Sequence, residues 1–279
     1  MKRIMREKTG ENKGFTLIEL LVVIAIIALL MSIALPSLRM VKELARSISC
    51  QANMHALAIC WMLYSEENDG EFCSSYTYDT INNWGFKYDW VWAPHQLNGP
   101  GSADEFSATR EERYEGIRRG ALFLYGQNYK VYHCPSDKFR KDSNKYRTYS
   151  IPDCMGGKEG IYPWPVIQKM TYLKSPGLKY IFVEEDDDRG YNMNSWILSP
   201  LAGVGVNPDV WNDPYLTVWH NRSSNLAFAD GHVDNHKWSP ETADFFSMEE
   251  FINLPWGSFS PSTSDGKEDL EWMIRGWAD

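Results

Sequence analysis

The sequence predicts an α+β fold in which one long N-terminal helix packs on a mainly antiparallel β-sheet. Three observations lead to this prediction. An almost uncharged apolar run covers residues 15–35, and a helical spacing of apolar residues continues to about residue 67. Short β-prone runs broken by Gly, Pro and Asn follow residue 70. The first two patterns are typical of helices, and the third is typical of strands joined by turns.

The apolar run has the length and composition of a membrane-spanning helix. It contains about 21 residues, which as a helix extend roughly 31 Å, and only Thr16, Glu19 and Ser32 have polar side chains. The leader ahead of it, residues 1–14, contains five basic and two acidic residues. Positive flanks stay on the cytoplasmic side, so we expect a single-pass anchor in the inner membrane with the C-terminal bulk outside.

The junction between the leader and the apolar run has the composition of a processing site. The small residue Gly14 precedes the run, and no Ala-x-Ala-like site follows it, unlike in an ordinary secretory signal. A cut after Gly14 would leave the whole helix on the mature protein. Residues 14–19, GFTLIE, resemble the cleavage and methylation segment of type IV prepilins and type II secretion pseudopilins. The resemblance implies cleavage by a prepilin peptidase after Gly14 and methylation of the new Phe15 amine.

Glu19 is a carboxylate within the apolar run, where an ionised group is costly unless it has a partner. Cleavage after Gly14 would create an ammonium group at Phe15, one helical turn away. In the family that the segment resembles, this glutamate pairs with the N-terminal amine of a neighbouring subunit during filament assembly. The resemblance therefore implies an assembly role for Glu19. The alternative is a signal anchor that tolerates one glutamate.

The helical pattern continues beyond the apolar run. Pro36 is expected to kink the helix without ending it, and the polar residues 66–69 followed by Gly70 form a stop signal. One apolar stripe is expected to face the head: Val41, Leu44, Ala45, Ile48, Ala52, Ala56, Ile59, Met62 and Leu63.

The chain thus divides into a cleaved basic leader (1–14), a transmembrane half of the stalk helix (15–35), an amphipathic half (36–69) and a globular head domain (70–279). The head is long enough for a single core. A net charge of −9 argues against binding to nucleic acid, because such binding usually requires an excess of positive charge. With 12 Trp, 15 Tyr and 12 Phe, the composition suits a β-rich head and equally suits glycan binding.

Within the head, residues 180–183 are the clearest strand and residues 105–119 are expected to contain a helix. Residues 131–137 resemble a segment that recurs in a large branch of pseudopilin-like proteins. The chain lacks a Cys-x-x-Cys spacing, which argues against zinc fingers and thioredoxin chemistry. The five cysteines are Cys50, Cys60, Cys73, Cys134 and Cys154, and the sequence does not decide how they pair. Disulfides between Cys134 and Cys154 and between Cys60 and Cys73 are two of the possibilities.

His220 is followed after nine residues by Asp230-Gly231, which matches the H-x9-DG pattern of the same pseudopilin-like branch. We expect Asp230-Gly231 to form a two-residue type I′ turn of a β-hairpin that pairs Ala229 with His232. This register would place His232, Asp234 and His236 on one face, opposite Leu226, Phe228 and Val233.

Two groups of residues could hold a metal, although no cofactor is firmly predicted. His232, Asp234 and His236 alternate along one strand and could bind a divalent metal, but a solvated strand face explains them more simply. The acidic run 184–188 has oxygen ligands suited to Ca²⁺, and major pseudopilins carry a calcium site. The run lacks the spacing of an EF-hand loop, and a solvated acidic loop after a strand is the simpler interpretation.

These observations predict a structural subunit that polymerises through its N-terminal helix into a pilus or a pseudopilus for protein secretion. Its implied partners are other pilin or pseudopilin subunits, a prepilin peptidase and an inner-membrane assembly platform. The alternative is a membrane-anchored envelope module whose aromatic head, periplasmic or at the cell surface, binds a glycan or another polymer. An anchored hydrolase is a third hypothesis, but the sequence has no Gly-x-Ser-x-Gly elbow and no His-Glu-x-x-His helix. We therefore expect no enzymatic activity.

Overall fold

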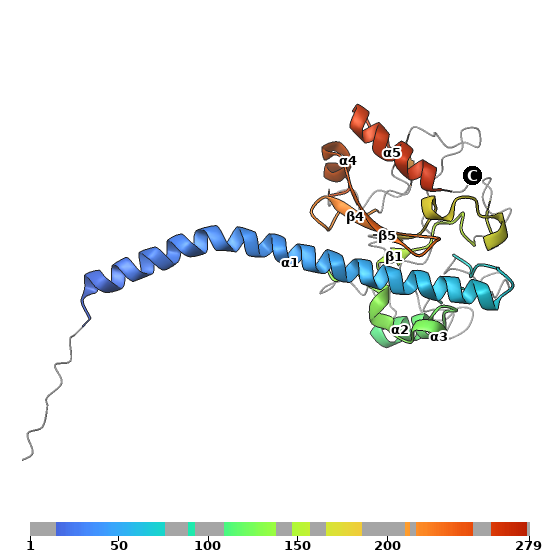
Figure 1. The fold of residues 1–279 in the computed structure, drawn as a ribbon, viewed down its shortest axis with the longest axis horizontal. Helices are drawn as coiled ribbons and strands as arrows, with labels where there is room; N and C mark the ends of the chain where they lie inside the picture. Colours follow the sequence, from blue (N-terminus) through green and yellow to red (C-terminus); the bar gives the residue numbers. More distant parts are fainter. Residues whose placement is uncertain are drawn as a thin grey trace, which may run out of the picture. The chain divides into compact units, whose positions relative to one another are not determined.

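The computed structural model describes residues 15–75, 89–92, 109–137, 147–156, 166–185, 210–212, 216–247 and 258–277. The chain divides into two compact units, Met1–Lys42 and Glu43–Asp279. In chain order, the helices and strands are α1 (Leu17–Glu67), α2 (Arg110–Arg119), α3 (Phe123–Gly126), the 3-10 helix η3 (Tyr129–Tyr132), β1 (Tyr149–Ser150), the 3-10 helices η5 (Met170–Tyr172) and η6 (Pro176–Leu178), β2 (Tyr180–Glu184), β3 (Trp211–Asn212), β4 (Ser223–Phe228), β5 (Val233–Lys237), α4 (Pro240–Phe245), β6 (Ser258–Phe259) and α5 (Ser264–Gly276) (Figure 1).

Helix α1 is continuous from Leu17 to Glu67 and contains Pro36, as the sequence predicts. The helix ends where the backbone turns left-handed, because Asp69 and Gly70 take φ values of 54° and 80°. The Gly70 N–H donates to the Ser65 carbonyl oxygen at 2.8 Å, which closes the last turn in the manner of a glycine C-cap.

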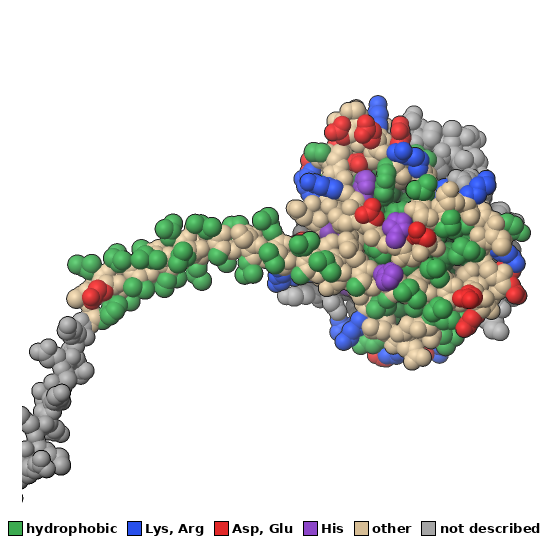
Figure 2. All heavy atoms as spheres, in the orientation of Figure 1, with side chains coloured by type: hydrophobic (Ala, Val, Ile, Leu, Met, Phe, Trp, Pro, Cys, Tyr) green, Lys and Arg blue, Asp and Glu red, His purple; other side chains and the backbone are tan. Residues whose placement is uncertain are grey.

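The first half of α1 carries apolar side chains that are exposed along its whole length (Figure 2). None of its most apolar stretch is buried within the described part of the protein. By length and composition α1 is able to cross a membrane. An uncovered apolar surface of this kind needs lipid or other protein around it.

The head unit is built on a four-stranded antiparallel sheet with the order β1-β2-β4-β5. Strand β2 confirms the prediction for residues 180–183, and both β2 and β4 are buried along their whole length. Strand β5 forms one edge of the sheet and is partly exposed. Strands β3 and β6 pair in a separate two-stranded sheet.

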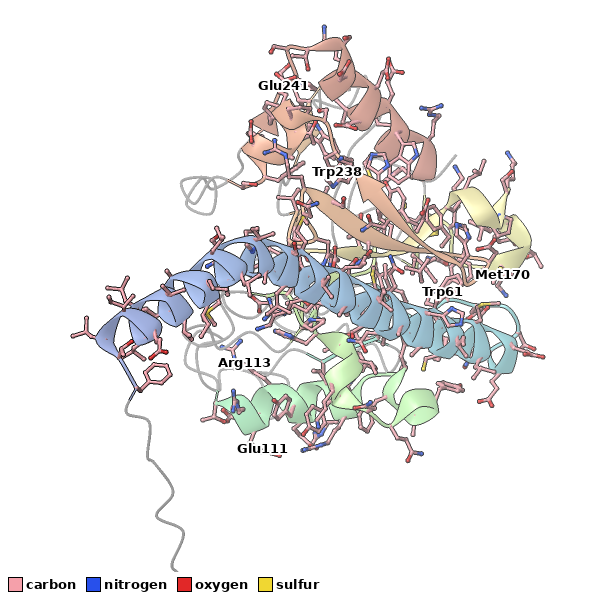
Figure 3. All side chains as sticks on the ribbon, turned by 60° about the vertical axis from the view of Figure 1, so that its left-hand side comes forward. Trp61, Glu111, Arg113, Met170, Trp238 and Glu241 are labelled. Carbon is pink, nitrogen blue, oxygen red and sulfur yellow. The ribbon has the colours of Figure 1, made fainter. Side chains whose placement is uncertain are left out.

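The part of α1 that belongs to the head unit lies between the sheet and the pair α2–α3 (Figures 1 and 3). On the sheet side, His55 Nδ1 lies 2.8 Å from the Gly231 carbonyl oxygen. On the other side, the Tyr125 hydroxyl of α3 donates to Glu67 at 2.8 Å. This arrangement confirms the predicted α+β fold, a long N-terminal helix packed on an antiparallel sheet.

The face of α1 that packs into the head differs from the predicted stripe. The buried side chains are Ser47, Cys50, Met54, Leu57, Ala58, Cys60, Trp61, Tyr64 and Ser65 (Trp61 in Figure 3). Most of the aliphatic residues of the predicted stripe are exposed: Val41, Leu44, Ile48, Ile59 and Leu63. The prediction is wrong because this half of the helix is apolar on more than one side, and the head binds the side rich in Cys, Met, Trp and Tyr.

Candidate functional site

The start of α1 carries the residues that the sequence assigns to processing and assembly. Gly14 lies outside the described residues, and the Phe15 side chain is exposed. The backbone N–H and the hydroxyl of Thr16 both donate to Glu19 Oε2 at 2.8 Å, and the Glu19 N–H donates to Thr16 Oγ1 at 3.3 Å. This reciprocal pattern is a capping box, which satisfies otherwise free N–H groups in the first turn.

The capping box gives Glu19 a structural role within one subunit, beside the assembly role predicted for it. Both bonds from Thr16 reach the same carboxylate oxygen, Oε2, so Oε1 is available to a second partner. Glutamine makes the same capping bonds but carries no charge. Replacing Glu19 with glutamine therefore separates helix capping from charge pairing.

A second set of functional side chains meets inside the head, at the junction of four elements. Cys50 comes from α1, Cys134 from the loop after η3, Glu184 from the end of β2 and His220 from the turn before β4, and all four are buried. Their potential ligand atoms lie within 4.8 Å of one another. In the described ranges, no other group of three or more His, Cys, Asp or Glu side chains converges in this way. We call these four residues the buried cluster.

Glu184 Oε1 is the atom on which the contacts of the buried cluster converge. The Cys50 thiol donates to it at 2.8 Å, and His220 Nε2 lies 2.8 Å from it. Cys134 Sγ lies 3.4 Å from the same His220 nitrogen, and the Tyr149 hydroxyl lies 3.1 Å from Cys50 Sγ. Two sulfur atoms, one carboxylate and one imidazole thus face a common centre.

Neighbouring polar groups hold the carboxylate and the imidazole of the buried cluster in place. His220 Nδ1 lies 3.3 Å from Glu43 Oε1 and 3.3 Å from the Ser136 hydroxyl, and that hydroxyl also bonds to Glu43. On the other side, the Asn225 N–H donates to Glu184 Oε2 at 2.7 Å. Each ring nitrogen of His220 therefore has a carboxylate partner, which fixes the orientation of the ring.

Burial and hydrogen bonding act in opposite directions on the groups of the buried cluster. Desolvation lowers the pKa of His220, but its interactions with Cys50 and Glu184 outweigh this effect and raise it to about 10. Desolvation also raises the pKa of the Cys134 thiol and of the Tyr149 phenol well above their ordinary values. With protons alone, His220 is thus an imidazolium and Cys134 a neutral thiol.

The hairpin after His220 has a three-residue loop, so the predicted two-residue turn is wrong. Ala227 pairs with Val233, which places Phe228 opposite His232, and the rings of these two residues stack at a centroid distance of 4.2 Å. In the loop, residues 229–231, only Gly231 has a positive φ, at 91°. A type I′ turn requires positive φ at both central residues, whereas a three-residue loop requires it only at the last.

The change of register moves the side chains of β5 to a different face from the one predicted. His232 and Asp234 share a face with Phe228 and Leu226, and so does His236. The prediction that the two histidines and Asp234 lie opposite Leu226 and Phe228 is therefore wrong. The error is one residue of register, which exchanges the two faces because side chains alternate along a strand.

The metal-ligand candidates His232, Asp234 and His236 each have a separate partner. His232 Nδ1 lies 2.5 Å from Asp230 Oδ1, while His236 Nε2 lies 3.4 Å from Asp269 and its ring stacks on Trp272 at 3.8 Å. The structure does not bring His232 and His236 together with Asp234 in a convergent group of the kind that Cys50 and its neighbours form.

The residues of the H-x9-DG motif serve different parts of the head. His220 belongs to the buried cluster, whereas Asp230 and Gly231 lie at the tip of the hairpin. Asn225, inside the motif, accepts hydrogen bonds through Oδ1 from Gln51 at 3.1 Å and from Ser47 at 3.4 Å. Together with the contact between His55 and Gly231, these bonds dock the hairpin on α1 along its length.

Sequence reasoning missed three members of the buried cluster, because they are separated by tens of residues along the chain. The interpretation of Glu184 as the start of a solvated loop is wrong, since it is the last residue of β2 and fully buried. Residues 186–188 lie outside the described residues. Cys134 lies in the segment 131–137 that resembles pseudopilin-like proteins, and this resemblance was the sequence signal that could have indicated a functional role for Cys134. The five cysteines are buried and no disulfide joins them, so the pairings considered are not formed.

A pocket of about 390 Å³ lies beside the hairpin. Strands β2, β4 and β5 and helix α5 contribute to its lining. The lining combines aromatic rings with one acidic and one basic group: Tyr180, Phe228, His232, Asp234, Trp272 and Arg275.

Residues 11–35 match the family described as the prokaryotic N-terminal methylation motif. The comparisons with curated proteins and with solved structures gave no match. The family match includes Phe15 and Glu19, and it supports the class of type IV pilins and pseudopilins. A pilin-like layout, with a long N-terminal helix on an antiparallel sheet, agrees with that class. The match does not reach His220, so the H-x9-DG branch stays a prediction.

Gly231→Ala tests the positive φ at the last position of the hairpin loop. We expect the substitution to destabilise the protein by about 1–2 kcal/mol, because alanine resists positive φ and its Cβ would lie 3.3 Å from Met62 Sδ. Gly70→Ala separates the two causes, because Gly70 also has a positive φ but has nothing within 4 Å of the added Cβ. The measurement is thermal unfolding of the full chain in detergent. A Gly231→Ala protein as stable as the wild type would contradict the loop geometry.

Proposed function

We propose that this chain is a prepilin-like structural subunit. A prepilin peptidase removes the leader, residues 1–14, by cutting after Gly14, and the amine of Phe15 is then methylated. Residues 15–35 anchor the subunit in the inner membrane, and residues 36–69 continue the stalk helix to the head, residues 70–279, outside the cytoplasm. An inner-membrane assembly platform then assembles it with other pilin or pseudopilin subunits into a pilus or a pseudopilus for protein secretion.

The observation that carries this proposal is the exposed apolar half of α1, most of which lies within the methylation motif. The family match covers residues 11–35, and the apolar side chains from Phe15 to Val41 are exposed in the single chain. A cleaved secretory signal would be lost from the mature protein, whereas cleavage before the helix retains it. A retained helix of this kind can lie in lipid first and between other subunits later.

The second half of α1 supports the same proposal. Ile48, Ile59 and Leu63 are exposed while the opposite side of the helix packs into the head. The apolar surface therefore continues along the outer side of the helix beyond the membrane-length segment. Other subunits of the assembly would cover this surface, which the described residues of the head leave exposed.

Substitutions at Glu19 test the assembly step. We expect Glu19→Gln to reduce assembly roughly tenfold or more, a factor that corresponds to about 1.4 kcal/mol of lost charge pairing, although glutamine keeps the capping box. We expect Glu19→Ala to reduce it at least as much. The measurement is the fraction of protein recovered in cross-linked or sedimentable assemblies from cells that express each variant.

Ser32→Ala is the control for these variants. Ser32 is a second polar residue of the apolar run, and its hydroxyl bonds to the Leu29 carbonyl oxygen at 2.7 Å. We expect this variant to assemble like the wild type. If Glu19→Gln assembles normally and Glu19→Ala does not, capping is the function of Glu19 and charge pairing is not. If both Glu19 variants assemble normally, the proposed filament role is wrong.

The pocket beside the hairpin favours a second candidate function, a membrane-anchored module that binds a glycan or another envelope polymer. Aromatic faces and a few polar groups are the usual lining of such sites, and Trp272, Asp234 and Arg275 provide both. This function is compatible with the first, because the pocket belongs to the head and assembly would use α1.

Binding of soluble oligosaccharides by the full chain in detergent tests this second function. We expect isothermal titration with cello-, chito- and malto-oligosaccharides to detect binding that Trp272→Ala weakens at least tenfold, because the substitution removes an aromatic face of the pocket. Trp61→Phe, a change in the core away from the pocket lining, should leave the affinity unchanged. Equal binding by wild type and Trp272→Ala, or none by either, would remove the support that the pocket provides.

A further inference from the structure

The buried cluster contains four groups that are metal ligands in other proteins and that face one centre. The atoms are Cys50 Sγ, Cys134 Sγ, Glu184 Oε1 and His220 Nε2. Tetrahedral zinc bonds sulfur at about 2.3 Å and nitrogen or oxygen at about 2.0–2.2 Å, so its neighbouring ligands lie roughly 3.3–3.8 Å apart. The separations in the cluster, from 2.8 Å to at most 4.8 Å, lie on both sides of this range.

The chemistry of the four groups selects the kind of metal. Two thiolates and an imidazole favour zinc or another borderline-to-soft ion, whereas Ca²⁺ and Mg²⁺ prefer oxygen ligands throughout. Four protein ligands would complete a tetrahedral shell and leave no position for water or substrate, which is typical of structural zinc sites. All four residues are buried, so the site is closed to bulk solvent.

The surroundings of the cluster have the hydrogen bonds that accompany metal ligands. A ligating histidine usually gives its other ring nitrogen to a carboxylate, and His220 Nδ1 lies 3.3 Å from Glu43. The second oxygen of Glu184 accepts the Asn225 N–H at 2.7 Å, and the Ser136 N–H points to Cys134 Sγ at 3.4 Å. Each of these bonds orients a ligand and leaves its metal-facing atom directed at the centre.

We propose that Cys50, Cys134, Glu184 and His220 bind one structural zinc ion that fastens α1 to the sheet. On binding, the two thiols and the His220 imidazolium each lose one proton to solvent, so that each ligand atom offers a lone pair to the metal. The ligands come from α1, the loop after η3, β2 and the turn before β4, and the ion therefore cross-links elements that are distant in sequence. This site does not depend on the filament proposal.

A disulfide between Cys50 and Cys134 is the competing use of the two sulfur atoms. It would explain neither the approach of His220 Nε2 to within 2.8 Å of Glu184 nor the carboxylate behind its other nitrogen. Oxidation would release two protons and two electrons to an external oxidant, and it would lower the mass of the chain by two hydrogen atoms. Mass spectrometry therefore distinguishes it from zinc binding.

The direct test is the zinc content of the full chain, purified in detergent without chelators and measured by inductively coupled plasma mass spectrometry. We expect about one zinc ion per chain, and we expect its removal by a chelator to lower Tm by several degrees. A zinc-free protein that also fails to take up added Zn²⁺ would overturn the proposal. An intact mass lower by two hydrogen atoms in most chains would overturn it as well.

Variants assign the ligands. We expect Cys50→Ser and His220→Gln to lower the zinc content at least tenfold, while Cys60→Ser, a buried cysteine on the same helix outside the cluster, keeps it. If the ligand variants fail to fold, Co²⁺ bound to the wild type provides the test. Thiolate-to-cobalt charge-transfer bands and tetrahedral d–d bands support the proposal, and cobalt bound without thiolate bands contradicts it. Zinc content that Cys50→Ser leaves unchanged would also contradict it.

Discussion

The structure depends on one constraint: a single continuous helix, α1, has to satisfy two different surroundings. From Phe15 to Val41 its apolar side chains are exposed in the part of the chain that the structure describes, and water is a poor environment for such a surface. From Cys50 to Tyr64 one side of the same helix is buried in the head. The first segment therefore requires lipid or neighbouring helices, and the second requires the sheet, while the backbone hydrogen bonds of the helix satisfy its peptide groups in either environment.

The head holds the second segment of α1 through polar contacts as well as apolar packing. Asn225 accepts bonds from Ser47 and Gln51 of α1, and the Gly231 carbonyl oxygen contacts His55, so the hairpin is tied to the helix at several points. The buried cluster adds a further connection between the helix and the centre of the sheet. Buried polar groups of this kind are directional, and they specify how the helix is docked more closely than apolar contacts alone do.

The sequence predicted the α+β class, the long helix and the strand β2 because hydrophobic periodicity and β-propensity are local signals. It failed where two local solutions were equally compatible with the residues. Asp230-Gly231 fits a two-residue or a three-residue loop, and only the φ of Asp230 decides between them. The second half of α1 is apolar on two sides, and the head covers the side that contains Cys50 and Trp61. The buried cluster was beyond local reasoning because four separate elements form it.

Identifying the mature N-terminus is the most direct test of the central claim. That claim is that a processed and retained helix anchors this protein and assembles it. The protein is purified from the membranes of cells that contain a prepilin peptidase. Intact-mass and peptide mass spectrometry then identify its first residue. The account predicts a chain that begins with N-methylated Phe15 and keeps all of α1, and a Gly14→Val chain that retains residues 1–14. A mature protein cut after the apolar run, or one that keeps Met1 to Gly14 in the presence of the peptidase, would contradict it.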